Sequence, residues 1–336
     1  MTRVAVLGAG AWGTAIAGHI AARTTERPPV VLWTRDAAHA RTIDASRENA
    51  RYLPGIVVPA GVVVDHSLDA VRAADVLLLA VPMRAVADVV QALRDAGVVA
   101  PLVLLAKGFI AVSDQPGGVA LSHQYLGPRW PAPVAIASGP SFAEEVARGL
   151  PTALTVAATS GDLAHRVAGL LRGDAMRVYE SDDITGVEVG GAVKNVLAIA
   201  AGASDGLGFG HNARAALVTR GLAETGRLSA ALGGARETLM GLAGLGDLVL
   251  TCTGNLSRNR RVGLALAEGR ALPEILAGIG HVAEGVPAAR AVRMLAAHHR
   301  IDMPICEAVD RVLNEGLPPR QAVLELLRRE PRQEAG

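Results

Sequence analysis

Three glycines near the N-terminus, in the stretch VLGAGAWG, constrain the fold more than any other feature of the chain. Gly8, Gly10 and Gly13 follow the apolar run 3–7 and stand at the start of a segment with helical spacing. In such a turn the first glycine permits a tight bend, the second lets the backbone approach a pyrophosphate, and the third lets the helix pack closely on the strand. Phosphates then lie at the helix N-terminus, where free amides favour anions. The pattern predicts a dinucleotide site, and we expect Trp12 to line the nucleotide.

The first half of the chain alternates short apolar runs with helix-like segments. Between the runs, segments such as 83–95 carry apolar residues at helical spacing. Strands separated by helices are typical of a parallel sheet covered on both faces. We therefore predict an α/β N-terminal region of the Rossmann type, with a doubly wound parallel sheet. The expected strands, buried on both faces, are 3–7, 30–33, 75–81, 101–106 and 133–137, with 152–156 and 176–180 as extensions.

The pattern changes near residue 187, where strand-like runs give way to alanine-, leucine- and glycine-rich segments at helical period. We place a domain boundary there. Residues 1–187 are predicted to form the dinucleotide-binding domain and residues 188–336 an all-α C-terminal domain, of which about 329–336 is a frayed tail. The expected helices are 188–203, 212–232, 256–268, 288–298, 304–314 and 318–328.

The composition excludes several classes of partner. With 336 residues, half of them hydrophobic, the chain can bury a large core. The formal net charge of +1 provides no overall field for nucleic acid or an anionic membrane, and 3% aromatic residues give few platforms for base stacking. No apolar run is expected to approach the roughly 18 residues of a membrane span, and no secretory leader is expected before the first strand. These features predict a cytoplasmic protein without nucleic-acid or membrane partners.

Cysteine and histidine spacing predicts neither disulfides nor a metal. Cys252 and Cys306 are the only cysteines, and the nine histidines show no ligand pattern. Such sparse cysteine use is typical of a reducing compartment. We therefore expect no metal cofactor.

Lysine is far rarer than arginine in this chain. Of 33 basic residues, only Lys107 and Lys194 are lysine. Arginine serves wherever a residue only needs to be positive, whereas lysine offers a compact charge whose pKa can fall into a useful range. Two lysines can also simply survive in an arginine-biased composition. Lys194 stands with Asn195 in the otherwise small and apolar stretch 190–202, and Lys107 follows a strand at its C-terminal end, where open α/β sheets bind ligands.

The end of the second expected strand bears on the choice of dinucleotide. An NAD-binding protein commonly has an acid here that bonds the ribose 2′-hydroxyl. This chain reads VVLWTRD at 30–36, so Thr34 and Arg35 come before Asp36. A guanidinium suits a 2′-phosphate, which favours NADP(H), with NAD(H) as the second possibility. In the alternative interpretation Arg35 only ends the strand and Asp36 reads the ribose.

Six short motifs follow one another along the chain. They are GAGAWG at 8–13, LLAKG at 104–108, SGPSFA at 138–143, GGAVKN at 190–195, GLGDLVLTC at 244–252 and SRNRR at 257–261. Together they closely resemble NAD(P)-dependent glycerol-3-phosphate dehydrogenase of the bacterial type, from residue 3 to about residue 328. The fit is stronger than to the related 6-phosphogluconate and 3-hydroxyacid dehydrogenases. One departure is Ala11, where family members often carry serine.

The resemblance implies reversible reduction of dihydroxyacetone phosphate to sn-glycerol 3-phosphate for phospholipid synthesis, at a site between a Rossmann domain and a helical substrate-binding domain. It implies that Lys194 is the catalytic, proton-transferring residue. The residues around the substrate would be Lys107, Gly139, Ser141, Lys194, Asp247, Ser257, Arg258 and Asn259. Those in contact with the cofactor would be Gly8, Gly10, Trp12, Gly13, Arg35, Lys107, Ala143, Arg258, Val282 and Glu284.

The implied reaction explains why a lysine is needed. Hydride transfer to a ketone leaves negative charge on the carbonyl oxygen, and a positioned acid supplies a proton. Lys194 can do this as an ammonium and can take the proton back as an amine, with Asp247 to orient it. Burial and nearby cations would lower its pKa toward the working range. In the alternative interpretation Lys194 lies on the surface, with its stem on apolar neighbours.

The doubly charged substrate also needs an anion site. Arg258 in SRNRR offers two parallel hydrogen bonds to a phosphate, and we assign Arg260 and Arg261 structural roles. Without the resemblance, the same run is typical of a solvated face or a nucleic-acid patch. Ser141, in the turn 138–143, is expected to cap the following helix or to bond the substrate, and the two roles are compatible.

Two other functions fit parts of the pattern. A β-hydroxyacid dehydrogenase of the same fold would recognise a carboxylate in place of the phosphate. A non-catalytic NADP-sensing protein would have no need of Lys194, Asp247 and Arg258 together.

We also expect the glycine-rich stretch 202–210 to form a loop that closes over the substrate, and the helical domain to support a homodimer.

Overall fold

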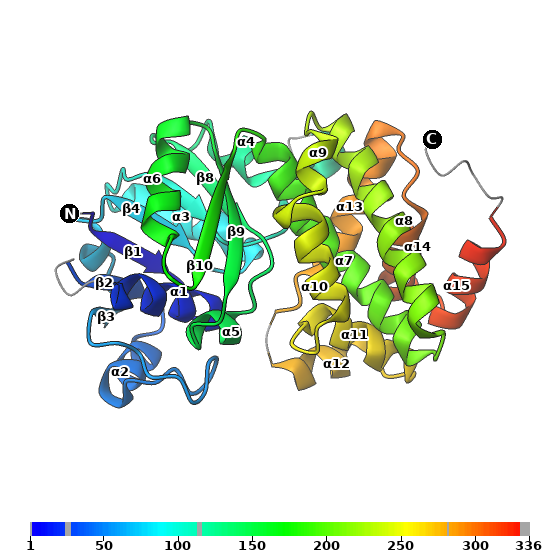
Figure 1. The fold of residues 1–336 in the computed structure, drawn as a ribbon, viewed down its shortest axis with the longest axis horizontal. Helices are drawn as coiled ribbons and strands as arrows, with labels where there is room; N and C mark the ends of the chain where they lie inside the picture. Colours follow the sequence, from blue (N-terminus) through cyan, green and yellow to red (C-terminus); the bar gives the residue numbers. More distant parts are fainter. Residues whose placement is uncertain (1, 24–27, 113–115, 281, 330–336) are drawn as a thin grey trace.

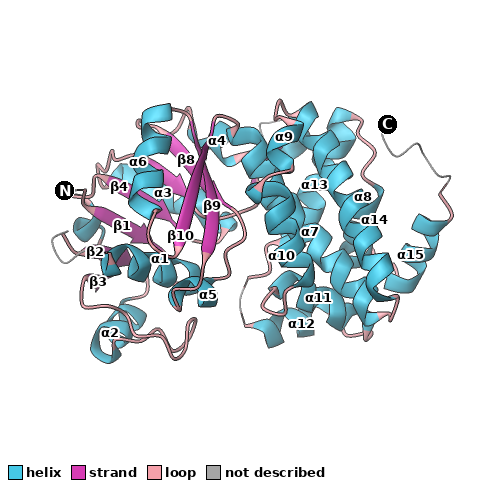
Figure 2. Ribbon diagram, viewed as in Figure 1, coloured by secondary structure: helices cyan, strands magenta, loops and turns pink. Residues whose placement is uncertain are grey.

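The computed structural model describes residues 2–23, 28–112, 116–280 and 282–329. A sheet with helices on both faces forms one half of the molecule, and a bundle of helices forms the other (Figure 1). Colouring by secondary structure shows that all strands lie in the first half (Figure 2). This is the α/β fold with an all-α continuation predicted from the sequence. Most of the predicted frayed tail, residues 330–336, lies outside the described residues.

The main sheet has eight strands in the order β10-β9-β8-β5-β4-β1-β2-β3. They are β1 (Val4–Leu7), β2 (Val30–Trp33), β3 (Val62–Asp65), β4 (Val76–Leu79), β5 (Leu102–Leu104), β8 (Val134–Ser138), β9 (Thr152–Ala158) and β10 (Met176–Ser181). Every strand predicted from the sequence is present. The sequence analysis missed β3, an edge strand in which Val63 is 44% exposed. A second, small sheet pairs β6 (Ile110–Ala111) with β7 (Val119–Ala120).

Helices occupy the connections and the whole second half. Those of the first half are α1 (Ala11–Ala22), α2 (Ala37–Ser46), α3 (Val86–Asp95), α4 (Ser122–Leu126), α5 (Ala143–Ala147) and α6 (Gly161–Leu171), with the short 3-10 turns η1 (Leu68–Val71), η2 (Met83–Ala85) and η3 (Pro116–Gly118). Those of the second half are α7 (Ile184–Gly206), α8 (Gly210–Ala231), α9 (Arg236–Leu239), the π-helical turn η4 (Leu242–Gly246), α10 (Asp247–Thr253), α11 (Arg258–Ala267), α12 (Leu272–Ile279), α13 (Gly285–His299), α14 (Pro304–Asn314) and α15 (Pro319–Leu327). All the predicted helices are present, whereas α9, η4, α10 and α12 were not foreseen.

One pair of strands departs from the parallel order. β8 and β9 are antiparallel, with Ala137 paired to Val156, whereas the other neighbours in the main sheet are parallel. The chain between β8 and β9 carries only the short helix α5, which packs against α1. Because α5 does not cross a face of the sheet, the chain returns to the sheet at the end where β8 finishes. Strand β9 therefore runs in the opposite direction to β8. The sheet is therefore mainly parallel, with this one exception.

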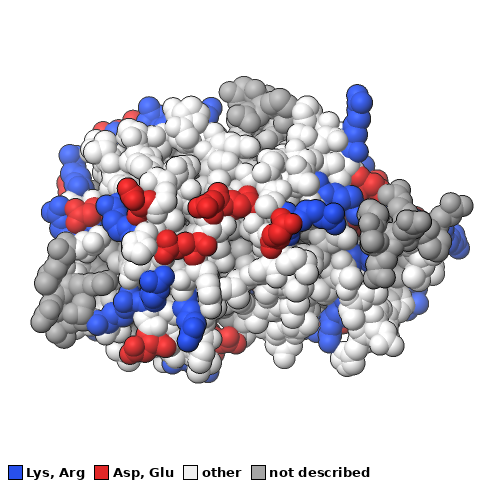
Figure 3. Space-filling model, turned by 45° about the horizontal axis from the view of Figure 1, so that its top comes forward, with Lys and Arg blue, Asp and Glu red and all other residues white. Residues whose placement is uncertain are grey.

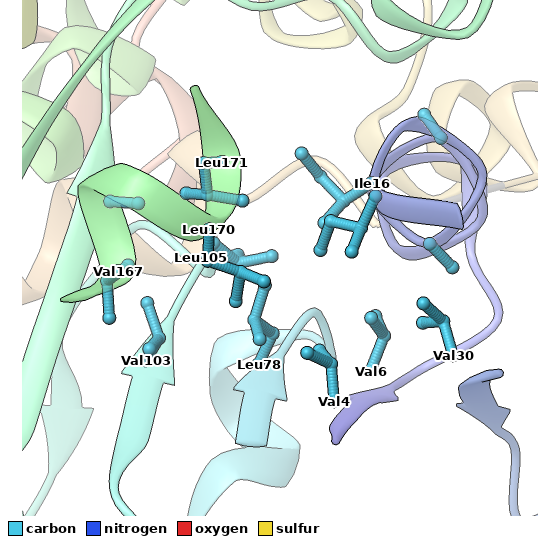
Figure 4. Packing of buried hydrophobic residues seen from close by; sticks show 14 of the residues in the cluster. Val4, Val6, Ile16, Val30, Leu78, Val103, Leu105, Val167, Leu170 and Leu171 are labelled. Atoms are coloured by element: carbon cyan, nitrogen blue, oxygen red, sulfur yellow. The ribbon is translucent and has the colours of Figure 1, made fainter. Parts of the chain in front are cut away.

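Two apolar layers hold the helices on the sheet. Figure 4 shows Val6 and Leu78 pointing from the strands toward Ile16 of α1, with Leu171 of α6 packed alongside. The alternate strand residues, such as Leu77, point to the opposite face and pack against α3. Successive side chains of a strand point to opposite faces, so strands covered on both sides are apolar throughout. This explains why these strands read as continuous hydrophobic runs.

Helix α7 forms the centre of the helical half. Helices α8, α10, α11, α13 and α14 all pack against it. Most of its apolar residues are buried, and Val193, Val196 and Leu197 are completely buried. In Figure 1, α7 runs between α8 and α10, next to the sheet half. Because α7 also contacts β8 and β9, part of this helix lies at the junction between the two halves of the molecule.

The prediction of a loop over 202–210 is wrong, because most of this stretch is helical. Only residues 207–209 separate α7 from α8. A Cβ at Gly202 would lie 2.0 Å from the carbonyl oxygen of Arg260, and a Cβ at Gly263 would lie 2.0 Å from another backbone oxygen. These glycines are present because α7 and α11 cross with their backbones almost in contact. A connection as short as 207–209 is a tight turn between packed helices and not a lid.

The expectation that no apolar run approaches the length of a membrane span is also wrong. Among the described residues, α7 is long enough at 23 residues, and apolar enough, to cross a membrane. However, 83% of its most apolar stretch is buried inside the protein. Its apolar surface is covered by protein, as in a core helix, and it carries Glu188 and Lys194.

Basic and acidic side chains are interspersed on the surface. Figure 3 shows lysine and arginine side chains beside aspartate and glutamate side chains over one face of the molecule. Neither sign forms a continuous patch on that face. This distribution agrees with the formal net charge of +1.

Candidate active site

The glycine turn between β1 and α1 has the geometry that a dinucleotide requires. Gly8 has a φ of +115°, and a Cβ there would lie 2.7 Å from the carbonyl oxygen of Ala80. A Cβ at Gly13 would lie 1.9 Å from the carbonyl oxygen of Gly8, so the helix sits directly on the turn. At Gly10, by contrast, no described atom lies within 4 Å of the Cβ position, and no side chain caps α1. The open amides fit the diphosphate of a dinucleotide.

Asn49, which the sequence analysis did not single out, holds this turn in place. Its side-chain amide donates to the carbonyl oxygen of Ala9 at 2.9 Å and to Oγ1 of Thr14 at 2.8 Å. Asn49 is completely buried. It lies 35 and 40 residues along the chain from its two partners. A single asparagine at that distance gives no local signal from which this contact can be predicted.

At the end of β2, the side chain of Arg35 is exposed, whereas the carboxylate of Asp36 caps α2. Oδ1 of Asp36 accepts the backbone N–H groups of Ala38 at 3.0 Å and His39 at 3.1 Å, and so caps α2. The N–H of His39 is the main reason why the pKa of Asp36 lies below its usual value. Arg35 is exposed and makes no side-chain bond to another described residue. The guanidinium is thus available, while the neighbouring carboxylate is occupied by the helix.

Both lysines of the chain meet at one buried carboxylate. Nζ of Lys107 donates to Oδ2 of Asp247 at 2.6 Å, and Nζ of Lys194 donates to Oδ1 of the same residue. Nζ of Lys194 also donates to Oγ1 of Thr251 at 3.1 Å. The side chains of Lys107, Lys194 and Asp247 are 16%, 8% and 2% exposed. The alternative placement of Lys194 on the surface is therefore wrong.

Burial sets the proton affinity of Lys194. Removal of the ammonium from water outweighs the attraction of Asp247, and the charge of Lys107 adds to it, so the pKa of Lys194 falls from 10.5 to about 7. Such a shift is worth about 5 kcal/mol in favour of the neutral amine. Burial alone would raise the pKa of Asp247, but the two lysines together lower the pKa below its usual value. The site holds a carboxylate beside an amine that can gain or lose a proton near neutral pH.

A π-helical turn delivers Asp247 to the lysines. The turn η4 directly precedes α10, whose first residue is Asp247. Gly244 within it has no room for a side chain, because a Cβ would lie 2.1 Å from the carbonyl oxygen of Leu239. Single π turns widen a helix locally and are frequent at functional sites. The motif GLGD therefore combines a tightly packed turn with the acid that it positions.

Lys107 lies in the loop after β5, at the C-terminal ends of the parallel strands. Besides Asp247, it donates to the carbonyl oxygen of Gly139 at 3.2 Å. Gly139 follows β8 and has a φ of +141°, which favours glycine. Oγ of Ser141 donates to the same carbonyl at 2.9 Å. The N-cap of α5 is Phe142, so the expected capping role of Ser141 is wrong.

The N-terminus of α11 contributes the next group of expected residues. Oγ of Ser257 accepts the N–H three residues further on, at 3.2 Å, and caps the helix. The side chain of Asn259 is bonded at both ends, donating to Oδ1 of Asn195 at 2.9 Å and accepting the N–H of Gly285 at 3.0 Å. Arg258 is exposed and makes no side-chain bond to another described residue. Its guanidinium is available to an anion, while Asn259 joins α7, α11 and α13.

The structural role expected for Arg260 is confirmed. Its guanidinium binds Oδ2 of Asp205 on α7 at 2.7 and 3.0 Å. Arg214 binds the same carboxylate at 3.0 Å. These contacts hold α11 and α8 against the end of α7.

Glu284 links the helical half to the sheet half. Oε1 of Glu284 accepts the N–H of Met83, at the start of η2, at 3.1 Å. Burial raises the pKa of Glu284, with the Met83 N–H and the charge of Arg258 acting in the opposite direction. Val282 is half-buried just before it. Arg258 and Glu284 thus lie near each other on the side of the helical half that contacts the turn after β4.

Trp12 and Ala143 lie at the start of two neighbouring helices. Trp12 is the second residue of α1 and Ala143 the first of α5, and these helices pack together. Both residues are half-buried and contact the apolar core above the sheet. That Trp12 lines a nucleotide, and that Ala143 contacts a cofactor, stay predictions.

Hydrogen bonds join most of the expected substrate residues into one group. The joined residues are Lys107, Gly139, Ser141, Lys194 and Asp247. Thr251 also belongs to it, and it escaped the sequence analysis although it stands one helical turn after Asp247 in the same motif. Arg258 is not bonded to this group.

Neither cysteine forms a disulfide. Cys252 and Cys306 are both buried free thiols. In the described part of the chain, no three side chains of histidine, cysteine, aspartate or glutamate are grouped so that they could hold a metal ion.

Comparison with known proteins identifies the family. The model of the NAD-dependent glycerol-3-phosphate dehydrogenase N-terminus matches residues 3–164, and that of the C-terminus matches residues 183–324. Proteins named glycerol-3-phosphate dehydrogenase (NAD(P)+) from Aromatoleum aromaticum and Burkholderia orbicola are each 53% identical, over 99% of this chain and 100% of theirs. The crystal structure of glycerol-3-phosphate dehydrogenase from Coxiella burnetii has a TM-score of 0.91 and 42% identity, over 98% of this chain and 99% of that chain. Because the matches run through both halves and include the segments that carry Lys107, Lys194 and Asp247, the chain belongs to the NAD-dependent glycerol-3-phosphate dehydrogenase family of oxidoreductases.

Proposed function

We propose that this protein reversibly reduces dihydroxyacetone phosphate to sn-glycerol 3-phosphate, with Lys194 as the residue that transfers the proton. The observation that carries the proposal is the buried pair of Lys194 and Asp247, joined by Lys107 where the strands end. The names of relatives that are 53% identical support the same reaction. A role in supplying glycerol 3-phosphate for phospholipid synthesis is part of this proposal.

The bound nicotinamide would supply or accept the hydride. During reduction the ketone oxygen gains negative charge, and the Lys194 ammonium donates a proton to it. During oxidation the neutral amine takes the proton of the hydroxyl. Asp247 and Thr251 each accept one hydrogen of the ammonium, which leaves the third for the substrate. A pKa of about 7 lets Lys194 serve both directions.

Positive charge in the site favours a dianionic substrate. Two lysines face a single carboxylate, so the protonated cluster carries excess positive charge. The guanidinium of Arg258 is available to bind a phosphate by two parallel hydrogen bonds. Ser257, as the cap of α11, keeps its hydroxyl hydrogen available as a further donor. We assign the phosphate to this end of α11, with Asn259 holding the helix to α7.

We propose NADP(H) as the preferred cofactor, with NAD(H) as an alternative cofactor for the same site. The diphosphate is assigned to the glycine turn with Gly8, Gly10 and Gly13. Arg35 is exposed without a partner among the described residues, and Asp36 is committed to capping α2. This supports a 2′-phosphate contact by Arg35 over ribose recognition by Asp36. Trp12, Ala143, Val282 and Glu284 are assigned to the remaining cofactor contacts.

Three further features belong to the proposal. We place the domain boundary near residue 187, which the end of β10 at Ser181 and the start of α7 at Ile184 support. We propose a cytoplasmic location. We also propose a homodimer, which sedimentation of the purified protein would test against a monomer of 34.5 kDa.

One assay tests the activity. NADPH absorbance at neutral pH is followed with and without dihydroxyacetone phosphate, and again with a β-ketoacid in its place. Loss of NADPH only with the ketose phosphate supports the proposal. Turnover of the ketoacid alone would indicate a β-hydroxyacid dehydrogenase. NADPH binding without turnover of either compound would indicate a sensing protein.

A further inference from the structure

A second buried acid lies on the same helix as Lys194. Glu188, Gly191 and Lys194 follow one another at intervals of three residues on α7, so they lie on neighbouring turns of one side. The side chain of Glu188 is 4% exposed. A buried carboxylate is unfavourable unless it is paired. The proposed reaction gives Glu188 no role.

The partner of Glu188 is His123, on the short helix α4. Nδ1 of His123 contacts Oε2 of Glu188, and the backbone N–H of His123 donates to Oε1 at 3.3 Å. The His123 side chain is 16% exposed. The ring thus reaches solvent, whereas the carboxylate does not. The pair forms a polar connection from the surface to the interior.

A small cavity lies between this pair and Lys107. Its polar and charged lining consists of Lys107, Ser122, Ser138 and Glu188. The space open to the centre of a water molecule is about 10 Å³, which corresponds to one water. The remaining lining, from the loop after β5 and from β8 and α7, is uncharged. Lys107 and Glu188 are therefore the charged residues of this lining.

The hydroxyl of Ser138 points to an occupant of this cavity. Ser138 is 1% exposed, and its Oγ has no hydrogen-bond partner among the described residues. Leaving a buried hydroxyl unpaired is unfavourable. A water in the cavity would satisfy this hydroxyl and could bond the Glu188 carboxylate as well.

Gly191 keeps the space open. A Cβ at this position would lie 2.9 Å from Oγ of Ser138 and 3.5 Å from Cγ of Lys107. Even an alanine would therefore press on the Ser138 hydroxyl, while only touching the stem of Lys107. The second glycine of the motif GGAVKN leaves room between the lysine and the serine.

The proposed reaction creates a need for such a connection. Each reduction removes one proton from Lys194, whose side chain is 8% exposed. Lys107 is 16% exposed, and we assign that surface to the region filled by substrate and cofactor. Nζ of Lys107 and Nζ of Lys194 bind opposite oxygens of the Asp247 carboxylate, so the two amines lie at one group. Lys107 is therefore the cation from which the neutral amine of Lys194 would regain its proton.

We propose that His123, Glu188 and a water molecule held by Ser138 form a proton path between solvent and the two lysines. The proposal rests on the proposed function, because only a reaction that consumes a proton at Lys194 needs the path. Since they act through Lys107 and do not touch the substrate, His123 and Glu188 are positioning residues.

During reduction, protons pass along this path from solvent toward Lys194. Lys107 gives a proton to the neutral Lys194 amine. The cavity water gives a proton to Lys107 and takes one from the carboxylic acid form of Glu188. Glu188 receives its proton from Nδ1 of the His123 imidazolium, and the ring is protonated again by solvent. One proton enters for each proton that the substrate takes, and oxidation reverses every transfer.

The test compares kcat for dihydroxyacetone phosphate reduction, with saturating NADPH, in Glu188→Gln, His123→Ala and wild type. His19→Ala is the matched control, because His19 is also a half-buried histidine, bonded at 2.7 Å to the carbonyl oxygen of Leu171. We expect kcat to fall about tenfold or more in both test variants, because proton transfer becomes limiting. The KM for the substrate should stay within about twofold. The solvent deuterium isotope effect on kcat should rise in the test variants and stay unchanged in the control.

Added imidazole separates a proton path from a structural role. It should restore kcat of His123→Ala in proportion to its concentration, and it should leave Glu188→Gln and His19→Ala unchanged. If Glu188→Gln does not fold, Ser138→Ala, which removes only the unpaired hydroxyl, should show the same rise in isotope effect. Unaltered kcat and isotope effect in the folded test variants, or a His123→Ala defect that imidazole does not relieve, would overturn the path. A wild type that does not reduce the ketose phosphate overturns the proposed function and the path together, whereas an active wild type with unaffected variants overturns only the path.

Discussion

Lys107 and Lys194 come from different halves of the molecule and bind opposite oxygens of one carboxylate, that of Asp247. Lys107 follows a strand of the sheet, whereas Lys194 and Asp247 come from helices of the second half. The carboxylate therefore ties the halves together at the junction where we place the chemistry. Its negative charge also partly offsets the cost of burying two ammonium groups. Burial lowers the pKa of Lys194, and Asp247 acts against this effect.

Replacing Lys194 by arginine should abolish most of the turnover. A guanidinium keeps the charge but stays protonated at working pH, so it cannot exchange a proton with the substrate. We expect kcat to fall by about 10² to 10⁴. NADPH affinity, measured by fluorescence titration, should change little, because the glycine turn and Arg35 are untouched. Near-normal kcat in Lys194→Arg would exclude Lys194 as the proton donor.

The two directions of the reaction should have opposite pH dependences. The pKa of Lys194 is lowered to about 7, so the ammonium is present below this pH and the amine above it. Reduction needs the ammonium, and its kcat/KM should fall as pH rises through about 7. Oxidation needs the amine, and its kcat/KM should rise over the same range. A reductive limb near pH 10, the range of an unperturbed lysine, would contradict the assignment.

Asp247→Asn tests the source of that pKa. The charge of Asp247 raises the pKa of Lys194, against the effect of burial. Without the carboxylate charge, the pKa should fall further, and the reductive limb should move to lower pH. The measurement is the same pH profile of kcat/KM, and an unmoved limb would mean that another group titrates.

Arg35→Asp should reverse the cofactor preference. Hydrogen bonds to charged groups are worth about 1.5–3 kcal/mol, so loss of a 2′-phosphate contact should raise the KM for NADPH about 10- to 100-fold. The KM for NADH should rise little or fall. Arg41→Asp, at an exposed position of α2, is the matched control for a charge change nearby. If the ratio of the two KM values is the same in Arg35→Asp and wild type, Arg35 lies outside the site.

Gly202→Ala should destabilise the protein strongly, although alanine normally favours a helix. Its Cβ would lie 2.0 Å from the carbonyl oxygen of Arg260, so α7 and α11 must move apart. We expect the free energy of unfolding, from urea titration, to fall by about 1–3 kcal/mol or more. At Gly169 in α6, no described atom lies within 4 Å of the Cβ position, and Gly169→Ala should gain about 0.5–1 kcal/mol. Equal effects at both positions would refute the close-contact explanation.

Features that depend on neighbouring residues could be predicted from the sequence. The turn at Gly8 and Gly13 was foreseen because its glycines act within one strand-turn-helix unit. The strands were foreseen because burial on both faces makes them apolar throughout. The scarcity of lysine, together with the small residues around Lys194, indicated a chemical role that its burial beside Asp247 fits.

Features that depend on distant segments could not be predicted. Glycines at 202–210 read as a loop, because local propensity favours one, but contact with α11 makes a glycine necessary inside the helix. The reversal between β8 and β9 follows from where α5 packs, which no strand pattern records. Asn49 and the pair of His123 and Glu188 act through contacts far along the chain, and so gave no local signal.

The order of strands and helices, the diphosphate turn and the choice of lysine over arginine are all written into short stretches of this chain, because each depends on backbone geometry or side-chain chemistry close at hand. The proton affinity of Lys194, by contrast, arises only when α7 is surrounded by other elements. Burial removes the ammonium from water, and two separate segments surround it, the loop that carries Lys107 and the helix α10 that carries Asp247 and Thr251. An electrostatic property of this kind depends on what lies within a few ångströms in space, and it exists only in the folded protein.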